Sequence, residues 1–266
     1  MLDYRTRTQR LIGPEKMERL KKSAVLVFGA GGVGSYVIEA LARSGLGRVD
    51  IVDGDRVSVT NLNRQLIALE TTIGQQKAEL ARDRIRSIRS DLASQSFPLF
   101  FTKETGDLLD FTRYDYIVDA IDTVTAKLEI IRRAKLAQVP VISAMGTGNK
   151  LNPMAFQIAD IAKTSICPLA RVMRRELKRM GLTDVKVLFS TEEALRPEAA
   201  DPAEGRLEKN DPNAASSEAY CPEKIPPEVK GTAGRPVPGS VPFVPSVAGL
   251  LIAAEVFNDL CRNEGR

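Results

Sequence analysis

The sequence predicts a doubly wound α/β fold, in which helices cover both faces of a mostly parallel sheet. Short segments that are apolar throughout recur along the 266 residues, and such segments are typical of parallel strands buried on both faces. Amphipathic segments of helical length separate them, which is the alternation of α/β proteins. A glycine-rich turn directly follows the first long apolar segment, at the place where this class of fold binds ligands.

The glycine-rich turn predicts a nucleotide site. It follows a strand expected at 24–28 and fills the pattern G-x-G-x-x-G of Rossmann-like folds with Gly29, Gly31 and Gly34. The helix expected at 35–44 would present its free N–H groups to an anion. A strand expected at 48–53 ends in Asp53, about 20 residues beyond the glycines, where such folds place a ribose-binding acid. This pattern alone is compatible with NAD, FAD or ATP.

The same patterns place the remaining elements. Further helices are expected at 14–22, 75–92, 126–138 and 165–181, and further strands at 97–101, 114–122, 140–144, 154–158 and 185–190. The strand at 154–158 is predicted to be antiparallel, and the basic arm at 4–13 is predicted to be extended. Residues 145–150 are predicted to form a flexible turn beside the crevice at the carboxyl ends of the strands.

The last part of the chain differs in composition. Residues 191–238 are rich in Pro, Ala, Gly and Glu, and they are longer than the irregular segments of compact domains, which predicts a mobile loop or crossover. Prolines and acids interrupt the apolar stretch at 241–260, so it predicts a buried C-terminal helix rather than a membrane span. We expect one domain over residues 1–266, with no membrane partner.

The composition is ordinary for a globular protein, with 43% hydrophobic and 27% charged residues, and it excludes several chemistries. Histidine is absent, which excludes Ser-His-Asp and Cys-His catalysis and every histidine-ligated metal site. Cys167, Cys221 and Cys261 have no C-x-x-C spacing, so neither a disulfide framework nor a four-cysteine zinc site is supported. This cysteine usage, with no apolar run at the N-terminus, predicts a cytoplasmic protein.

Positive charge is concentrated where a polyanion could bind. The net charge of +4 permits a nucleic-acid partner without requiring one. The helix at 165–181 carries five cations that would repel one another without a polyanion nearby, so it is predicted to bind RNA. These cations are Arg171, Arg174, Arg175, Lys178 and Arg179. Arg82, Arg86 and Arg89 are predicted to lie on a solvated face of the helix at 75–92 and to add phosphate contacts if RNA binds.

Polar residues that suit a triphosphate follow Asp53. They are Asp55, Asn61, Arg64 and Lys77. Two cations beside the glycines would stabilise a leaving pyrophosphate, whereas backbone N–H groups alone can hold the pyrophosphate of a dinucleotide. These residues favour ATP, but they do not exclude a dehydrogenase.

Together with the glycine turn and Asp122, these residues resemble the adenylating enzymes related to ubiquitin-activating enzymes and to the ThiF/MoeB-type activators of sulfur-carrier proteins. The resemblance covers roughly residues 4 to 160 and implies that the nucleotide is ATP. The resemblance implies that Gly29, Gly31 and Gly34 contact phosphate and that Asp53 binds the ribose, with Asp55 as a helper. It also implies that the triphosphate is surrounded by Asn61, Arg64 and Lys77.

The same resemblance implies a metal ion and a second subunit. Asp122 would hold Mg²⁺, whose charge offsets the charge that develops on pyrophosphate. Arg7 matches the family's N-terminal arginine, which reaches into the ATP site of the partner subunit, so a homodimer is implied. The implied catalytic residues are Arg7, Arg64, Lys77 and Asp122.

Within this superfamily the sequence resembles the tRNA threonylcarbamoyladenosine dehydratases. It lacks the two C-x-x-C pairs of most sulfur-carrier activators, and the segments that carry the resemblance are 29–36, 145–153 and 160–164. The resemblance implies ATP-dependent adenylation of the carboxylate of threonylcarbamoyladenosine in tRNA, then dehydrative cyclisation with release of AMP and pyrophosphate. The substrate's carbamoyl nitrogen would close the ring, so no histidine or catalytic cysteine is required. Cys167 is then a bystander.

Two other functions stay open at this point. The chain could activate the C-terminus of a ubiquitin-like or sulfur-carrier protein, with Cys221 receiving sulfur or an acyl group and a sulfur-transfer protein as a partner. It could also be a catalytically idle Rossmann adaptor or an NAD-binding protein. In the first alternative the protein still adenylates a carboxylate with ATP, but the carboxylate belongs to a protein. In the second alternative the protein does not adenylate any substrate.

Overall fold

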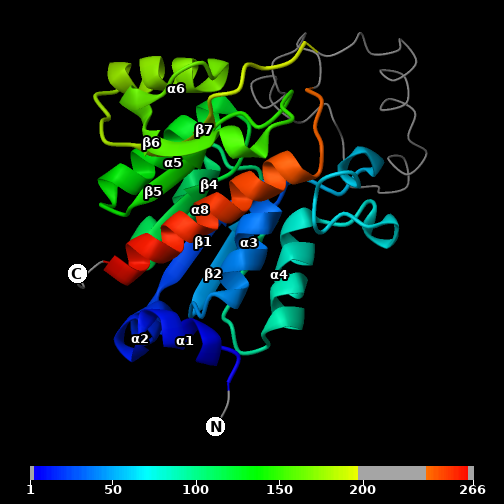
Figure 1. The fold of residues 1–266 in the computed structure, drawn as a ribbon, viewed down its shortest axis with the longest axis vertical. Coiled ribbons are helices and arrows are strands. Elements are labelled where there is room, and N and C mark those ends of the chain that lie inside the picture. The colour runs from blue at the N-terminus through cyan, green and yellow to red at the C-terminus, as the bar shows by residue number, and fades with distance from the viewer. Residues whose placement is uncertain (1–2, 197–237, 263–266) are drawn as a thin grey trace.

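The computed structural model describes residues 3–196 and 238–262, and within them a mostly parallel sheet lies between two layers of helices (Figure 1). The seven strands have the order β3-β2-β1-β4-β5-β7-β6, and β6 alone pairs antiparallel, with β7. Their bounds are β1 Ala24–Phe28, β2 Arg48–Val52, β3 Ser96–Phe97, β4 Tyr116–Asp119, β5 Val141–Ala144, β6 Phe156–Asp160 and β7 Lys186–Ser190. The predicted fold class and the antiparallel strand are therefore confirmed.

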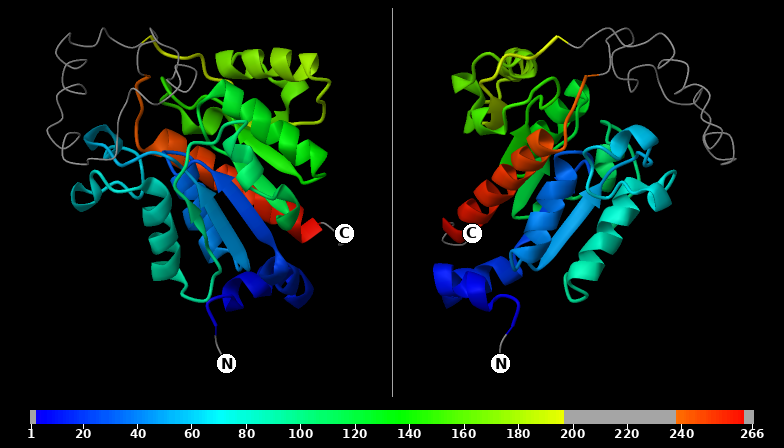
Figure 2. Two further views of the ribbon diagram at one scale, coloured as in Figure 1. Left: turned by 180° about the vertical axis from the view of Figure 1, so that it is seen from behind. Right: turned by 45° about the vertical axis from the view of Figure 1, so that its right-hand side comes forward.

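The helices cover both faces of the sheet, as the two further views show (Figure 2). They are α1 Thr6–Ile12, α2 Pro14–Lys22, α3 Gly34–Arg43, α4 Lys77–Ile88, α5 Val124–Leu136, α6 Pro168–Arg179 and α8 Phe243–Arg262. In β1, Val25 and Val27 pack in the core under α3, α4 and α8, whereas Leu26 and Phe28 pack in the core under α5 and α6. This two-sided burial explains why β1 is apolar at every position.

The N-terminal arm is helical, so the prediction of an extended arm is wrong. The N-cap of α1 is Arg5, and the carboxylate of Asp3, two residues before it, accepts a hydrogen bond from the Arg5 backbone N–H at 2.7 Å. Gly13 separates α1 from α2 with a φ of +86°, a conformation that favours glycine. Both helices lie at the end of the sheet where the parallel strands begin (Figure 1).

The strand predicted at 97–101 is shorter than expected. Only Ser96 and Phe97 belong to β3, because Pro98 has no N–H to continue the ladder and the N–H of Leu99 turns back to the Phe97 carbonyl at 2.9 Å. Phe101 then turns inward, and its ring lies 4.7 Å from that of Phe28, centroid to centroid. The apolar run thus serves the core rather than the sheet.

Arg89 lies at the C-terminal end of α4 and is buried, so the prediction that it is solvated is wrong. Its guanidinium donates to the Leu46 carbonyl at 2.9 Å, pairs with Asp91 and stacks 4.4 Å from the centroid of the Tyr4 ring. Arg82 is also partly covered and donates to Ser96 Oγ at 3.0 Å. Of the three arginines predicted to lie on this face, only Arg86 is largely exposed.

The C-terminal helix is largely buried, as predicted, and the structure shows that it packs along α3. Among the described residues, α8 is the one helix long and apolar enough to cross a membrane, but Ala248, Ile252 and Val256 bury its apolar stripe in the core. Close approach of the two helices requires glycine at position 249, since a Cβ there would lie 2.4 Å from the Val33 carbonyl oxygen. Most of the loop predicted at 191–238, together with Cys221, lies outside the described residues, and the single-domain organisation stays a prediction.

Candidate nucleotide-binding site

The glycine turn follows β1 at the end of the sheet where β1, β2 and β4 have their carboxyl ends, and we call this region, where the sequence predicts a ligand, the crevice. Gly29 has a φ of +91°, and a Cβ there would lie 2.7 Å from the Ala120 carbonyl oxygen. A Cβ at Gly34 would lie 1.8 Å from the Gly29 carbonyl oxygen, so both positions require glycine. At Gly31 a Cβ would meet only Gln65 Nε2, at 3.7 Å, which leaves this backbone open to a ligand. The first turn of α3 follows directly.

Asp53 joins the second strand to the glycine turn. One carboxylate oxygen accepts from the Ala30 N–H at 2.6 Å and the other from the Asp55 N–H at 2.8 Å. Burial raises the pKa of Asp53, an effect that the positive charge of Lys77 opposes. The carboxylate therefore sits at the edge of the crevice where the sequence predicts a ribose contact.

Lys77, the first residue of α4, is brought beside Asp53 and Asp55. It is buried, and its Nζ lies 3.0 Å from Asp55 Oδ2, whereas the Asp55 side chain remains about half exposed. The lysine charge is thus held at the crevice by an acid that stays open to solvent. A phosphate approaching the crevice would meet this charge already positioned.

Asn61 and Arg64 lie in the segment between β2 and α4, around a short 3-10 turn. Asn61 is buried, and its Oδ1 accepts from the Ser58 N–H at 3.2 Å. Arg64 donates to the Thr60 carbonyl at 2.8 Å and to Asn63 Oδ1 at 3.0 Å. Within the described residues Arg64 has no carboxylate partner, and partial burial lowers the pKa of its guanidinium. Its positive charge is therefore left for a ligand.

Asp122 lies beyond β4, in the turn that leads to α5. It is exposed, and its carboxylate contacts Thr123 Oγ1 at 3.3 Å. No group of three or more acids or cysteines that could hold a metal ion occurs among residues 3–196 and 238–262. A lone exposed carboxylate fits Mg²⁺ only in company with substrate phosphates, which is how Mg²⁺ is usually held in nucleotide sites.

A buried ion pair next to Asp122 was missed by the sequence reasoning. Lys127 is fully buried, and its Nζ lies 3.0 Å from Asp119 Oδ2 and 2.9 Å from the Ile121 carbonyl. Ser143 on β5 also donates to Asp119. The signal available in the sequence was a lysine in the first turns of a helix that follows a strand with an acid at its end.

The turn after β5, predicted to be flexible, is fastened from several sides. The Asn149 backbone N–H donates to the Gly239 carbonyl at 2.8 Å, its Oδ1 accepts from the Gly239 N–H at 2.7 Å, and its carbonyl accepts from Leu195. Asn63, next to Arg64, donates to the Ser240 carbonyl at 2.9 Å. Residues from both ends of the undescribed segment are therefore tied to the crevice.

The structure does not bring Arg7 together with the other predicted residues. It is exposed on α1, which lies at the opposite end of the sheet from the glycine turn (Figure 1). Within one chain it cannot contribute to the crevice.

The five cations on α6 are less free than the sequence suggests. Arg174 donates to the Thr164 carbonyl and hydroxyl, and Arg175 and Arg179 both pair with Glu176. Their mutual repulsion is therefore partly relieved inside the chain. Arg171 and Lys178 have no ion-pair partner in the described part of the molecule. The helix begins beside the crevice, since a Cβ at Gly146 would meet the Cβ of Leu169 at 3.9 Å.

Comparison with known proteins agrees with this geometry. The family model described as "ThiF family" matches residues 4–265. A tRNA threonylcarbamoyladenosine dehydratase of Bacillus subtilis is 39% identical over 99% of this chain and 96% of its own length. Crystal structures of the Escherichia coli tRNA N6-threonylcarbamoyladenosine dehydratase with AMP and with ATP are 28% identical, cover 95% of this chain and 92% and 91% of theirs, and superpose with TM-scores of 0.77 and 0.75.

A more distant relative matches a smaller part. The sulfur carrier protein adenylyltransferase of Thermus thermophilus is 36% identical over 49% of this chain and 48% of its own. The B. subtilis and E. coli proteins described above, whose matches cover nearly the whole of both chains, are dehydratases. The chain belongs to the ThiF family and, within it, to the tRNA threonylcarbamoyladenosine dehydratases.

Proposed function

We propose that this protein uses ATP to adenylate the carboxylate of threonylcarbamoyladenosine in tRNA and then closes the activated group into a ring. The observation that carries the proposal is the placement of Arg64 and Lys77 beside an open glycine turn. The B. subtilis relative, which matches over 99% of this chain, carries the dehydratase name, and the E. coli enzyme has been crystallised with ATP and with AMP.

The reaction balances without further reactants. A carboxylate oxygen of the substrate attacks the α-phosphorus of ATP, and pyrophosphate leaves. The carbamoyl nitrogen then attacks the acyl carbon, loses its proton and expels AMP with the former carboxylate oxygen. Because both groups belong to one substrate, the second step has a high effective molarity. The product is lighter than the substrate by one water.

The crevice residues supply binding and charge for the first step. The N–H groups around Gly31 and at the start of α3 bind phosphate, and the Asp53 carboxylate accepts from a ribose hydroxyl. Arg64 and Lys77 stabilise the charge that develops on the leaving pyrophosphate. Asp122 would hold Mg²⁺, which supplies further positive charge to the phosphates when bound. Neither histidine nor a cysteine nucleophile is needed.

We propose a homodimer in which Arg7 of one subunit completes the crevice of the other. Its position at the far end of its own sheet supports this arrangement. The outer side of α8 also keeps Phe243, Leu250 and Leu251 exposed, which suits a protein interface. Mixing inactive Arg7→Ala and Lys77→Ala chains should restore part of the activity, because each mixed dimer contains one complete site. No recovery in demonstrably mixed dimers would contradict the arrangement.

We further propose that tRNA lies along α6, where Arg171 and Lys178 contact phosphates. A cytoplasmic location stays a prediction of the sequence. In this scheme Cys167, which is buried, has no chemical role.

The alternative substrate is the C-terminus of a ubiquitin-like or sulfur-carrier protein, with a sulfur-transfer partner. The match to the T. thermophilus adenylyltransferase, which covers about half of each chain, favours this reading. Exchange of pyrophosphate into ATP that depends on such a protein and is indifferent to tRNA would support it.

The proposal is tested by incubating the protein with ATP and tRNA that contains threonylcarbamoyladenosine. We expect AMP and pyrophosphate in equal amounts and a modified nucleoside lighter by one water in the tRNA digest. Lys77→Ala should abolish both signals, and tRNA with unmodified adenosine should give neither. Absence of the lighter nucleoside with active ATP and correctly modified tRNA would refute the proposal.

A further inference from the structure

We infer that Lys127 is a positioning residue, which holds the turn bearing Asp122 in place for the adenylation step. The inference rests on the proposed function. Lys127 lies in the first part of α5 and is completely buried, so it does not touch a ligand in the crevice itself. Its effect must reach the reaction through the residues that it holds.

The contacts of Lys127 join both sides of the turn. Its Nζ lies 3.1 Å and 3.0 Å from the two carboxylate oxygens of Asp119, the last residue of β4, and donates at 2.9 Å to the carbonyl of Ile121. Asp119 also accepts from the Ile121 N–H at 3.3 Å and from the Ser143 hydroxyl on β5. We call Asp119, Lys127 and Ser143 the buried clamp. Both backbone polar groups of Ile121, the residue before Asp122, are thus bound by the clamp.

The same turn touches the glycine turn. The Ala120 N–H donates to the Phe28 carbonyl at 2.8 Å, and its carbonyl lies so close to Gly29 that no side chain fits between them. The Ala120 Cβ would also lie 3.4 Å from a Cβ at Gly34. The clamp therefore fixes Asp122 relative to the phosphate-binding glycines, not only relative to its own helix.

Stability alone is a poor explanation for this clamp. Two charges buried away from water often contribute no more to stability than apolar side chains of the same size. Charges are retained where they fix one geometry, and here the fixed element is a turn with an exposed carboxylate at the crevice. Groups that orient a ligand-binding side chain typically contribute 10- to 100-fold to affinity or activity.

The test removes both charges, so that no unpaired charge remains in the core. In the double variant Asp119→Asn with Lys127→Met, the asparagine can still accept from Ser143, but the Ile121 carbonyl loses its donor. Thermal unfolding reports whether the variant folds. Calorimetric titration then gives ATP affinity with and without magnesium. We expect magnesium-dependent ATP affinity to fall roughly 10-fold or more, with ATP affinity in the absence of magnesium retained.

A double-mutant cycle identifies the route of the effect. If the clamp acts through Asp122, adding the double variant to Asp122→Asn should change magnesium-dependent affinity little beyond Asp122→Asn alone. Additive effects would overturn the inference. An affinity equal to wild type in the folded double variant would also overturn it.

A matched control lies at the other end of the sheet. Lys186, the first residue of β7, pairs with Glu255 and Asp259 of α8. The corresponding variant, in which Lys186→Met is combined with Glu255→Gln and Asp259→Asn so that no partner keeps an unpaired charge, should leave magnesium-dependent affinity unchanged. An equal loss in this control would mean that the effect is general destabilisation and would overturn the inference.

A milder variant decides the question if the double variant does not fold. Ser143→Ala removes one contact of Asp119 and keeps the ion pair, and we expect a smaller loss of magnesium-dependent affinity in the same direction. No loss would overturn the inference. Failure of wild-type protein to form AMP with tRNA would instead contradict the proposed function, so the two failures are distinguishable.

Discussion

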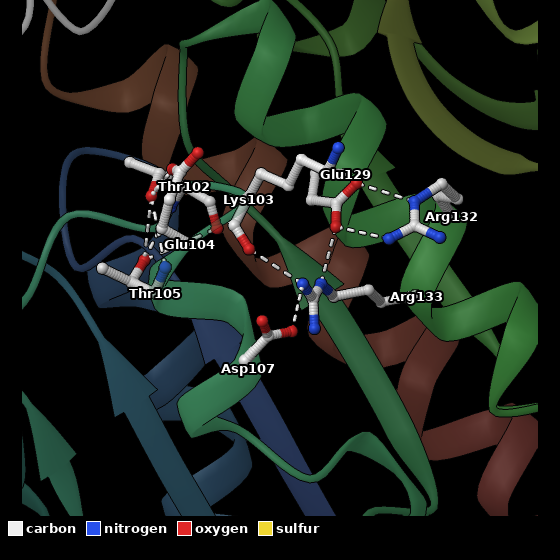
Figure 3. Close-up of polar contacts among 8 residues, drawn as sticks. All are labelled: Thr102, Lys103, Glu104, Thr105, Asp107, Glu129, Arg132 and Arg133. Carbon is white, nitrogen blue, oxygen red and sulfur yellow. Dashed lines mark hydrogen bonds and ion pairs between the residues drawn. The ribbon is translucent and has the colours of Figure 1, made fainter.

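Two polar clusters of this molecule contain similar side chains but are connected differently. In the network around Arg133, the Glu129 carboxylate pairs with Arg132 at 2.6 Å and with Arg133 at 2.7 Å (Figure 3). Arg133 also donates to the Lys103 carbonyl at 2.9 Å and pairs with Asp107 at 2.8 Å. Both arginines of this network thus find their carboxylates within the chain, and the network fastens α5 to the segment between β3 and β4.

The second cluster, which we call the crevice cluster, contains Arg64, Lys77, Asp53 and Asp55, and its cations are less fully paired. Arg64 donates to neutral groups of its own segment, the Thr60 carbonyl and the Asn63 side chain. Lys77 pairs with Asp55, whose side chain is about half exposed. Among the described residues, the guanidinium of Arg64 is therefore not paired with a carboxylate, whereas both arginines of the first network are. The difference indicates that the first cluster holds the fold together and that the second is completed by an anionic ligand.

The largest effect on activity is expected when a cation of the crevice cluster is removed. Arg64→Ala or Lys77→Ala should lower the rate of AMP formation by about 100- to 1,000-fold, because each removes a charge aimed at the leaving pyrophosphate. The unfolding temperature of Arg64→Ala should change little, since Arg64 has no ion-pair partner to lose among the described residues. Steady-state formation of AMP and a thermal unfolding scan measure the two effects. A large loss of stability with normal activity would reverse the assignment of the two clusters.

In the network around Arg133 we expect a loss of stability without a loss of activity. Arg133→Ala should lower the free energy of unfolding by about 1–2 kcal/mol, because it removes charged hydrogen bonds that are partly shielded from solvent. Activity per folded molecule should equal wild type. Denaturant unfolding and AMP formation check this, and a selective loss of activity would show that the network serves the site.

The helix α6 contains cations that are paired with an acid and cations that are not, so the same comparison can be made within one helix. Arg171 and Lys178 are open, whereas Arg175 and Arg179 already share Glu176. Replacing the open pair by alanine should weaken tRNA binding and reduce the slope of log affinity against log salt by about 2. Replacing the paired arginines should change the slope less. Filter binding over a range of salt measures this, and equal changes would contradict the distinction.

The smallest effect concerns pH. Burial raises the pKa of Asp53 above 3.8, whereas hydrogen bonds from Arg132 and Arg133 outweigh burial and hold the pKa of Glu129 below 4.5. Asp53 must be ionised to accept from a ribose hydroxyl, so nucleotide affinity should fall as pH drops, beginning above the pH at which an ordinary aspartate protonates. Glu129 contributes stability that is present above pH 4.5 and is lost as pH falls through its lowered pKa.

Nucleotide titrations and unfolding scans across this acidic range separate the two carboxylates. Affinity should be lost at a higher pH than the stability that Glu129 provides. In Asp53→Asn the early loss of affinity should disappear. If affinity and stability fall together in both proteins, the two groups do not differ as the structure indicates.

The sequence predicted those features that follow from local pattern. Apolar runs buried on both faces gave the central strands, and the spacing of Gly29, Gly31 and Gly34 with Asp53 located the crevice. The position of Lys77 beside Asp53 followed from the family resemblance, because composition does not report which helix start returns to which strand end.

The features that it missed depend on tertiary contacts. Arg89 belongs to a polar helix face by periodicity, but Tyr4 and Leu46 from distant segments cover it, together with Asp91 two residues on. Lys127 has the pattern of a solvated helical lysine, and the acid at the end of the preceding strand was the one sign in the sequence of its buried partner Asp119. Pro98 could have signalled the early end of β3, because proline cannot continue a strand ladder.

The most direct test of the central claim follows one oxygen atom. The claim is that the crevice cluster promotes adenylation of a carboxylate on tRNA. When the substrate carboxylate carries heavy oxygen, the account predicts that one labelled oxygen appears in AMP, as mass spectrometry of the released nucleotide would show, and that Lys77→Ala abolishes this transfer. Label found in inorganic phosphate with ADP as the nucleotide product, or unlabelled AMP, would contradict the account.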